Sequence, residues 1–234
     1  MSLRLRRTQP ELLDQGLGTL ADVRANLNDM WRLNRSTGGV SALLTHLLPR
    51  LRRARAPIRI ADLGTGAARL NVYLAHWARQ HGIALECYGL DVSARNLCVA
   101  REHVNGHSGV HLLQADGMAL PFAPCALDYC ISTLLLHHFE PDALIALLRH
   151  TFERARCGII MSDITRAALS QVGFRLIQPL IAPHPMTLHD GIVSIQRAYT
   201  PDELRDLARQ AGLGQARVYH HPLWRMTLVA DKYP

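Results

Sequence analysis

Short apolar segments alternate with amphipathic segments of helical period across the middle of this 234-residue chain. In the amphipathic segments, apolar residues recur at three- and four-residue spacing, as on one face of a helix. We expect strands at 58–63, 85–90, 110–114, 127–133 and 158–162, and helices at 69–81, 93–105 and 142–153. Strands that alternate with helices of this length form βαβ units, in which helices cover both faces of a parallel sheet. The sequence therefore predicts an α/β fold.

The two ends of the chain differ from this alternation. Residues 11–55 carry apolar side chains at helical spacing, so we expect a helical cover at 1–55 in front of a domain at 56–234. At the other end, strands are expected at about 215–220 and 224–230. They are too close together for a helical crossover and should therefore pair as an antiparallel hairpin.

The segment between the fifth expected strand and this hairpin has a weaker pattern. Residues 166–181 are predicted to be helical. Residues 182–198 contain two prolines and a glycine with little periodicity, and we predict a loop there. Together, residues from about 164 to 198 are expected to form a lid that crosses one edge of the sheet.

Acidic residues or glycines stand where three of the expected strands end. The first strand leads into Asp62-Leu63-Gly64-Thr65-Gly66, the second ends at Asp91 and the third at Asp116. Asp91 follows Gly66 by 25 residues and Asp116 follows Asp91 by 25, and parallel strands bring these ends to one edge of the sheet. Glycines let a ligand approach the backbone, and an acid after the second strand can bind both hydroxyls of a ribose. A dinucleotide-binding turn would have a third glycine where this chain has Arg69.

These motifs resemble those of the class I S-adenosylmethionine-dependent methyltransferases. Residues 60–66 resemble the first motif of that family, 88–93 its ribose-binding motif, 114–117 its adenine-contacting motif and 128–132 its fourth strand. The resemblance extends from about residue 56 to the C-terminus. It implies a Rossmann-like, seven-stranded, mostly parallel sheet with a C-terminal antiparallel hairpin, and an enzyme whose cofactor is S-adenosylmethionine.

A narrower resemblance points to a bacterial subgroup of small-molecule methyltransferases that often accompany polyketide or quinone pathways. Its motifs are Glu11-Leu12-Leu13-Asp14, Arg32-Leu33-Asn34-Arg35 with Gly38-Gly39, His137-His138-Phe139, and His189-Asp190-Gly191 with Ser194. The subgroup implies a small-molecule acceptor. We expect a hydroxy-aromatic or quinone-like metabolite, with methylation at oxygen favoured and methylation at carbon or nitrogen left open.

The class I resemblance implies which residues of the 56–234 domain contact the cofactor. They are Asp62, Gly64, Thr65, Gly66, Asp91, Val92, Asp116, Gly117 and Ser132. Asp62 would hold the amino group of the methionine part, Asp91 both ribose hydroxyls and Asp116 the adenine amino group, and Val92 would lie against the adenine face. Arg35 is the expected cofactor contact outside this domain: the 11–55 helices could cover the cofactor, with Arg35 near its carboxylate, or could form a dimer contact.

Histidines are the expected catalytic residues. His137 and His138 follow the fourth strand, where the acceptor and the methyl group should meet, and His189 lies in the expected lid. A general base is needed where the attacking hydroxyl must lose its proton. Adjacent side chains cannot face one site equally, so only one of His137 and His138 should be the base. The apolar run Leu134–Leu136 suits a hydrophobic acceptor.

Composition excludes several other classes. No window approaches 18 consecutive apolar residues, which argues against a transmembrane helix. The basic N-terminus lacks the apolar core of a signal peptide, so we expect a cytoplasmic protein. The five cysteines contain no C-x-x-C pair and the 13 histidines show no ligand spacing, so we expect no metal.

Two alternative functions remain open. The net charge is +7 and arginines crowd positions 50–59, so the chain could hold the phosphates of an RNA acceptor. Independently of its charge, the chain could bind the cofactor without turnover, as a binding or assembly protein. Arg52, Arg53 and Arg55 precede the first strand, so we expect them at the opposite edge of the sheet from the site. This disfavours nucleic acid and leaves peripheral membrane contact open. The choice between monomer and homodimer is also open.

Overall fold

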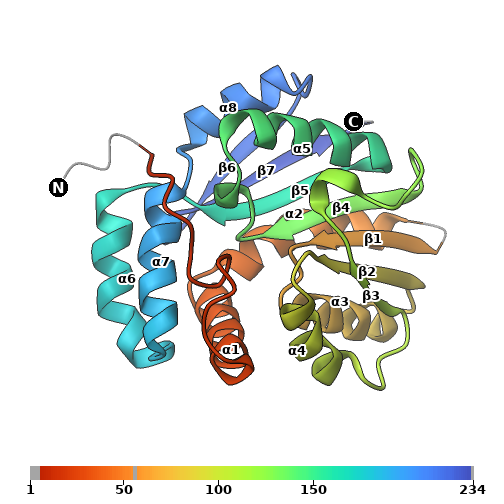
Figure 1. The fold of residues 1–234 in the computed structure, drawn as a ribbon. Helices are drawn as coiled ribbons and strands as arrows, with labels where there is room; N and C mark the ends of the chain where they lie inside the picture. The colour runs from red at the N-terminus through yellow and green to blue at the C-terminus, as the bar shows by residue number, and fades with distance from the viewer. Residues whose placement is uncertain (1–5, 55–56, 233–234) are drawn as a thin grey trace.

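The apolar segments predicted as strands pair into one sheet in the computed structural model, which describes residues 6–54 and 57–232 (Figure 1). The helices are α1 (Leu20–Ser36), α2 (Gly39–Arg53), α3 (Arg69–Gln80), α4 (Ala94–Val104), α5 (Pro141–Arg154), α6 (Ala168–Ile181), α7 (Pro185–Arg197) and α8 (Pro201–Gln210), with short 3₁₀ helices η1 (Gly117–Ala119) and η2 (Leu136–His138). The strands are β1 (Ile58–Leu63), β2 (Leu85–Asp91), β3 (Val110–Gln114), β4 (Leu127–Thr133), β5 (Ala155–Ile164), β6 (Arg217–His221) and β7 (Arg225–Asp231). Arg55 and the predicted boundary between 55 and 56 lie outside the described residues.

The seven strands follow the order β3-β2-β1-β4-β5-β7-β6. Strands β1 to β5 are parallel, and β7 runs antiparallel to both of its neighbours, β5 and β6. The predicted mostly parallel sheet with a C-terminal antiparallel hairpin is therefore confirmed. The strand order reverses between β1 and β4, and open α/β sheets bind ligands in the crevice that forms at the carboxyl ends of such strands.

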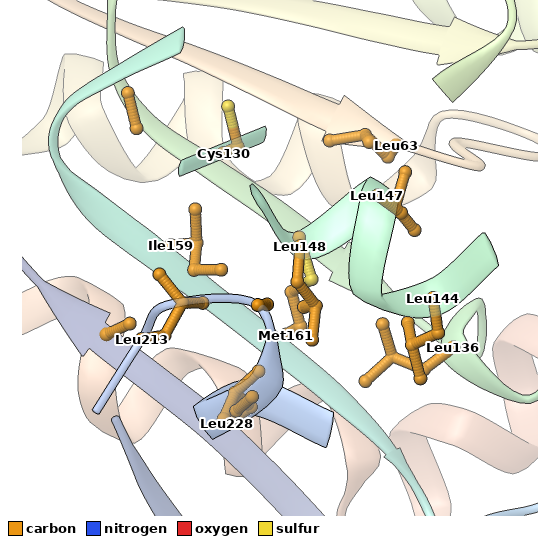
Figure 2. Close-up of a cluster of buried hydrophobic side chains, with 14 of the residues drawn as sticks. Leu63, Cys130, Leu136, Leu144, Leu147, Leu148, Ile159, Met161, Leu213 and Leu228 are labelled. Atoms are coloured by element: carbon orange, nitrogen blue, oxygen red, sulfur yellow. The ribbon is translucent and has the colours of Figure 1, made fainter. Parts of the chain in front are cut away.

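Two hydrophobic cores hold helices against the two faces of this sheet. Figure 2 shows the core under α5, where Leu148 lies beside Met161 of β5 and Leu147 lies toward Leu63 of β1. On the other face, Leu47 of α2 and Leu74 of α3 belong to a core that includes buried residues of β1, β2, β4 and β5. Each fully buried leucine contributes roughly 1.5–3 kcal/mol. These cores fix the positions of the strand ends, and with them the side chains at the carboxyl edge.

Residues 6–18, here the N-terminal segment, do not form the predicted helix. Helix α1 begins only after Thr19, whose side chain caps it. The backbone N–H groups of Leu12 and Leu13 donate to the carboxylate of Asp190 in α7 (2.8 and 3.3 Å). The helical prediction was wrong here because Gly16 and Gly18 adopt left-handed conformations (φ +68° and +79°), which interrupt a helix before Thr19.

Helix α7 replaces the loop predicted over 182–198. Pro185 occupies its first helical position, where a missing N–H costs nothing. Gly191 lies inside the helix, and a Cβ there would lie 2.1 Å from Cζ of Phe174 in α6. The residues that predicted a loop therefore start a helix and allow it to pack closely on its neighbour. Helices α6 and α7 lie side by side, next to α1 (Figure 1).

Candidate active site

A cavity of about 640 Å³, here the donor cavity, opens beyond the carboxyl ends of β1, β2, β3 and β4. Helix α1 and the N-terminal segment line it from the other side. Eight of the ten predicted cofactor residues line this cavity: Asp62, Gly64, Thr65, Gly66, Asp91, Val92, Asp116 and Gly117. Its volume is typical of small-molecule sites.

The turn after β1 exposes its backbone to the donor cavity because two glycines adopt left-handed conformations. The φ angle is +66° at Gly64 and +55° at Gly66. A Cβ at Gly64 would lie 2.9 Å from Cδ1 of Leu135, which also lines the cavity. A larger residue would therefore displace part of the cavity wall.

Asp91 ends β2 and organises the turn in front of it. Its carboxylate accepts hydrogen bonds from the backbone N–H groups of Gly66 and Ser93 (3.0 and 2.9 Å) and from the Asn96 amide (3.2 Å). Burial raises the pKa of Asp91, and these donors oppose the rise. A carboxylate has about four acceptor positions, so Asp91 keeps capacity for a further donor in the cavity.

Asp62 lies near the end of β1, buried but in contact with the donor cavity. Burial raises the pKa of Asp62 to about 7, against the hydrogen bond that Thr65 Oγ1 donates to it (2.9 Å). Within residues 6–54 and 57–232, no cationic side chain forms an ion pair with Asp62. An amino group in the cavity would supply the positive charge that favours the ionised carboxylate.

The wall of the donor cavity formed by Val92 and Asp116 is more exposed to solvent than the wall at Asp62 and Asp91. The Asp116 carboxylate accepts a hydrogen bond from Met118 N (2.9 Å) and so caps η1. Val92 is 70% exposed, although it lines the cavity. A planar ring that lay on Val92 would bury this apolar surface, which is favourable in water.

The two adjacent histidines of η2 have different surroundings. His138 lines the donor cavity, and its Nδ1 lies 2.9 Å from Asp14 Oδ2. His137 is buried, with Nδ1 2.8 Å from Asp163 Oδ1 and Nε2 3.3 Å from Glu11 Oε1. The structure therefore brings only His138 to the ligand space.

His137 is held as a cation. Burial alone would lower the pKa of His137, but Asp163 and Glu11 outweigh it and raise the pKa to about 10. Burial would likewise raise the pKa values of Glu11 and Asp163, yet protonated His137 keeps both below their usual range. These three residues therefore link the N-terminal segment to the end of β5 through buried charges.

Among the described residues, one cluster has donor atoms placed for a metal ion. The ligand atoms of Glu11, His137 and His138 lie within 4.8 Å of one another. Each imidazole Nδ1 already faces a carboxylate, and Glu11 also accepts a hydrogen bond from Ser194 Oγ. The expectation that no metal binds here stays a prediction.

A smaller cavity of about 100 Å³ lies under α6 and α7, and we call it the acceptor cavity after the role that we propose for it below. It adjoins the donor cavity, because Met30, Asn34 and Leu134 line both. Apolar side chains form most of its wall, including Phe174 and Trp224. This second cavity follows from α6 and α7 packing against α1, which the sequence did not reveal.

Four predicted site residues line neither cavity. Arg35 is exposed in the last turn of α1, His189 is partly exposed on α7, and His137 and Ser132 are buried. Arg69 lines the donor cavity instead of Arg35, and its guanidinium donates to Asn28 (2.7 Å). The position of Arg69 directly after the glycine turn was the sequence signal for it.

Known proteins share this sequence pattern and geometry. Residues 60–158 match the family model described as a methyltransferase domain. The 2-phytyl-1,4-naphtoquinone methyltransferase of Thermosynechococcus vestitus is 30% identical over 173 residues, 69% of this chain and 74% of the relative. The demethylmenaquinone methyltransferase of Staphylococcus haemolyticus is 26% identical over 168 residues, 67% of this chain and 69% of the relative.

Among solved structures, a SAM-dependent methyltransferase from Aquifex aeolicus superposes with a TM-score of 0.61 at 17% identity. The match covers 92% of this chain and 99% of that one, and it shows a shared fold. The chain belongs to the class I S-adenosylmethionine-dependent methyltransferases. It is an enzyme, and its cofactor is S-adenosylmethionine.

Proposed function

We propose that the enzyme methylates an oxygen of a small hydrophobic molecule with a hydroxy-aromatic or quinone-like ring. The acceptor cavity carries this proposal, because its apolar and aromatic wall meets the donor cavity at Asn34 and Leu134. A ring seated there would face the donor across this junction. Both relatives are named for quinone substrates, which supports a ring of this type.

We further propose that the residues at the carboxyl edge hold the cofactor as the family motifs imply. Asp91 would bind the ribose hydroxyls, Asp62 the amino group, and Asp116 with Gly117 the adenine. Among the described residues no cationic side chain pairs with Asp62, which supports its role as the partner of the cofactor's amino group. The bound cofactor supplies an electrophilic methyl group, and the main task of the chain is then to align the acceptor with it.

His138 is the proposed general base, and Asp14 is a positioning residue. Asp14 accepts a hydrogen bond from Nδ1 of His138, which leaves Nε2 to take the proton of the acceptor hydroxyl. Nε2 lies 3.9 Å from Glu11 Oε1, too far for a hydrogen bond. His137 is unsuited to this role, because carboxylates engage both of its nitrogens.

Single-turnover methylation of a hydroxy-naphthalene panel tests this assignment. His138→Ala should slow methyl transfer by about 10²–10⁴-fold, the usual contribution of a general base, with unchanged affinity for the cofactor. His189→Ala is the matched control, since His189 lines neither cavity, and it should react at the wild-type rate. An undiminished rate in His138→Ala would reject His138 as the base. NMR of the product distinguishes an O-methyl from a C-methyl group.

The outer face of α6 supports the expected membrane contact. Leu169, Val172, Leu176 and Leu180 recur on this helix at helical spacing, with exposed fractions of 67, 56, 70 and 87%. The helix contains no acidic residue, and Arg175 is exposed beside the leucines. Such a face suits a helix that lies in a lipid interface. No helix in the described part of the chain is long and apolar enough to cross a membrane.

We propose that α6 rests on a lipid surface, so that the lid formed by α6 and α7 takes up a lipophilic acceptor from it. Sedimentation with anionic vesicles tests this contact. Leu176→Gln combined with Leu180→Gln should lower the bound fraction, whereas Tyr73→Gln, at an exposed site on α3, should not. Equal binding by all three proteins would contradict the proposal.

The position of the arginines argues against the RNA alternative. Arg52 and Arg53 end α2 shortly before β1 begins, which is the amino edge of the sheet. Arg50 pairs with Asp231 at the same edge (2.5 Å). An RNA acceptor would bind with a steep salt dependence, and salt-insensitive acceptor binding would remove this alternative. Cofactor binding without turnover on any acceptor would instead favour a binding or assembly role.

A further inference from the structure

Arg225 brings a buried positive charge to the acceptor cavity. It is the first residue of β7, pairs in register with Ile164 at the end of β5, and lines the cavity. The residue is only 7% exposed. Burial lowers the pKa of Arg225 to about 10, partly offset by Asp163, so the guanidinium stays protonated at neutral pH.

In the part of the chain that the structure describes, most of this guanidinium has no hydrogen-bond partner. Nη2 donates to Thr37 Oγ1 (2.5 Å). Neither Nε nor Nη1 finds an acceptor among residues 6–54 and 57–232. Asp163 is engaged elsewhere, because its carboxylate accepts from His137 and from the backbone N–H of Ile164. Burying a cation whose donors lack acceptors costs free energy. An anion that pairs with the guanidinium would offset this cost, so the residue favours anion binding.

The acidic residues of the same cavity do not offer that anion. Glu11 is held by His137 and Ser194. Asp190 accepts hydrogen bonds from two backbone N–H groups of the N-terminal segment and from Asn26. Both carboxylates are therefore used in closing the N-terminal segment over the cavity, and Arg225 is left with unfilled donors.

Two glycines, Gly39 and Gly173, leave space for the side chains of Arg225 and Trp224. A Cβ at Gly39 would lie 3.2 Å from Cζ of Arg225 and 1.9 Å from Oδ1 of Asn34. On the opposite side, a Cβ at Gly173 would lie 2.8 Å from Trp224. Glycines thus allow both the guanidinium and an aromatic wall to sit close to α2 and α6. In the Gly38-Gly39 motif of the sequence, the absence of a side chain at Gly39 is therefore what allows Arg225 to pack this closely.

We propose that Arg225 is the anion-binding group of the acceptor cavity, and that the acceptor is an acidic ring compound whose carboxylate or conjugated oxyanion pairs with this guanidinium. The inference rests on the proposed function, because it names the charge of the same acceptor. The planar guanidinium presents its donors as a fork that matches two oxygens of a planar anion. The apolar walls would cover the rest of the ring.

Calorimetry in the presence of S-adenosylhomocysteine, at mildly acidic pH, tests the proposal with two pairs of ligands. The first pair is 6-hydroxy-2-naphthoate and its neutral amide, which have the same shape and differ in charge. The second pair is 4-hydroxycoumarin, an ionised enol, and 7-hydroxycoumarin, which is un-ionised. The first pair reports on a carboxylate, and the second on a conjugated oxyanion.

At least one anion should bind wild-type enzyme about 10- to 100-fold more tightly than its neutral partner, the value of a hydrogen bond to a charged group. Arg225→Met should abolish this preference and leave the neutral ligand unaffected, while Arg225→Lys should retain part of it. Arg217→Met, at an exposed position on β6, is the matched control and should behave as wild type. The melting temperature of Arg225→Met should not fall, because the substitution removes a buried charge that forms no ion pair among the described residues.

Two results would overturn the inference and leave the proposed function intact. One is equal binding of anionic and neutral ligands by wild type, a result that needs no variant to fold. The other is a preference for anions that survives in Arg225→Met. If no hydroxy-aromatic ligand of either charge binds, the proposed acceptor class is itself wrong, and the inference fails with it.

Discussion

We expect the wild-type enzyme to lose stability as the pH rises from neutral to alkaline. Replacing His137 with glutamine should remove this loss. Burial alone would lower the pKa of His137, but Asp163 and Glu11 raise it from 6.5 to about 10. Between these two values the native protein holds a proton that the unfolded chain has lost, so the free energy of unfolding falls as the pH rises. The contribution of the His137 proton to the free energy of unfolding is therefore complete below pH 6.5 and lost above about pH 10.

The size of the effect follows from this proton. One extra proton in the native state changes the free energy of unfolding by 2.303RT per pH unit, or about 4 kcal/mol between pH 7 and pH 10. That is a large part of the roughly 5–15 kcal/mol by which a domain is normally stable. Glutamine can still donate a hydrogen bond to a carboxylate, but it binds no proton in this range. The His137→Gln variant should therefore lack this pH dependence.

Urea unfolding followed by tryptophan fluorescence, repeated from neutral to alkaline pH, measures the effect. The stability difference between wild type and His137→Gln should shrink by about 4 kcal/mol across the range. His107→Gln, at an exposed histidine, is the control and should give a curve parallel to wild type. A constant difference between wild type and His137→Gln would refute the assignment of a buried charge to His137.

Three further outcomes are expected. Asp91→Ala should weaken S-adenosylhomocysteine binding by about 100-fold or more in calorimetry, because hydrogen bonding of the ribose to a charged carboxylate is lost, whereas Asp142→Ala, at an exposed position of α5, should not. Gly64→Ala should lower the free energy of unfolding by about 1–3 kcal/mol, since φ is positive and Leu135 blocks a Cβ. Dialysis against EDTA should leave turnover unchanged; lost activity together with bound metal would make the Glu11 cluster a metal site.

The sheet and most of the donor cavity could be predicted because their signals are local. Each strand ends in its own acid or glycine turn, and parallel pairing then places those ends together without further information. Asp62, Asp91 and Asp116 were found in this way. Arg35 was not placed correctly, because helical spacing shows that α1 is amphipathic but not which polar residue faces the ligand. Its last turn presents Arg35 to solvent and Asn34 to the cavities.

The acceptor cavity could not be predicted because its residues meet only through long-range packing. Arg225 enters it from β7, and Glu11 from the opposite end of the chain. The segment 182–198 was misjudged for a related reason. Its glycine and prolines are loop signals in isolation, whereas in the structure Pro185 begins helix α7 and Gly191 allows that helix to pack against the ring of Phe174.

The N-terminal segment contacts both histidines of η2. Glu11 and Asp14 lie three residues apart, and they bind the two adjacent histidines, His137 and His138. Asp14 orients the imidazole of the proposed base, and Glu11 together with Asp163 keeps His137 charged. The orientation of His138 and the charge of His137 therefore depend on the same short segment. Loss of its contacts would leave an acceptor hydroxyl near the donor without an oriented group to take its proton.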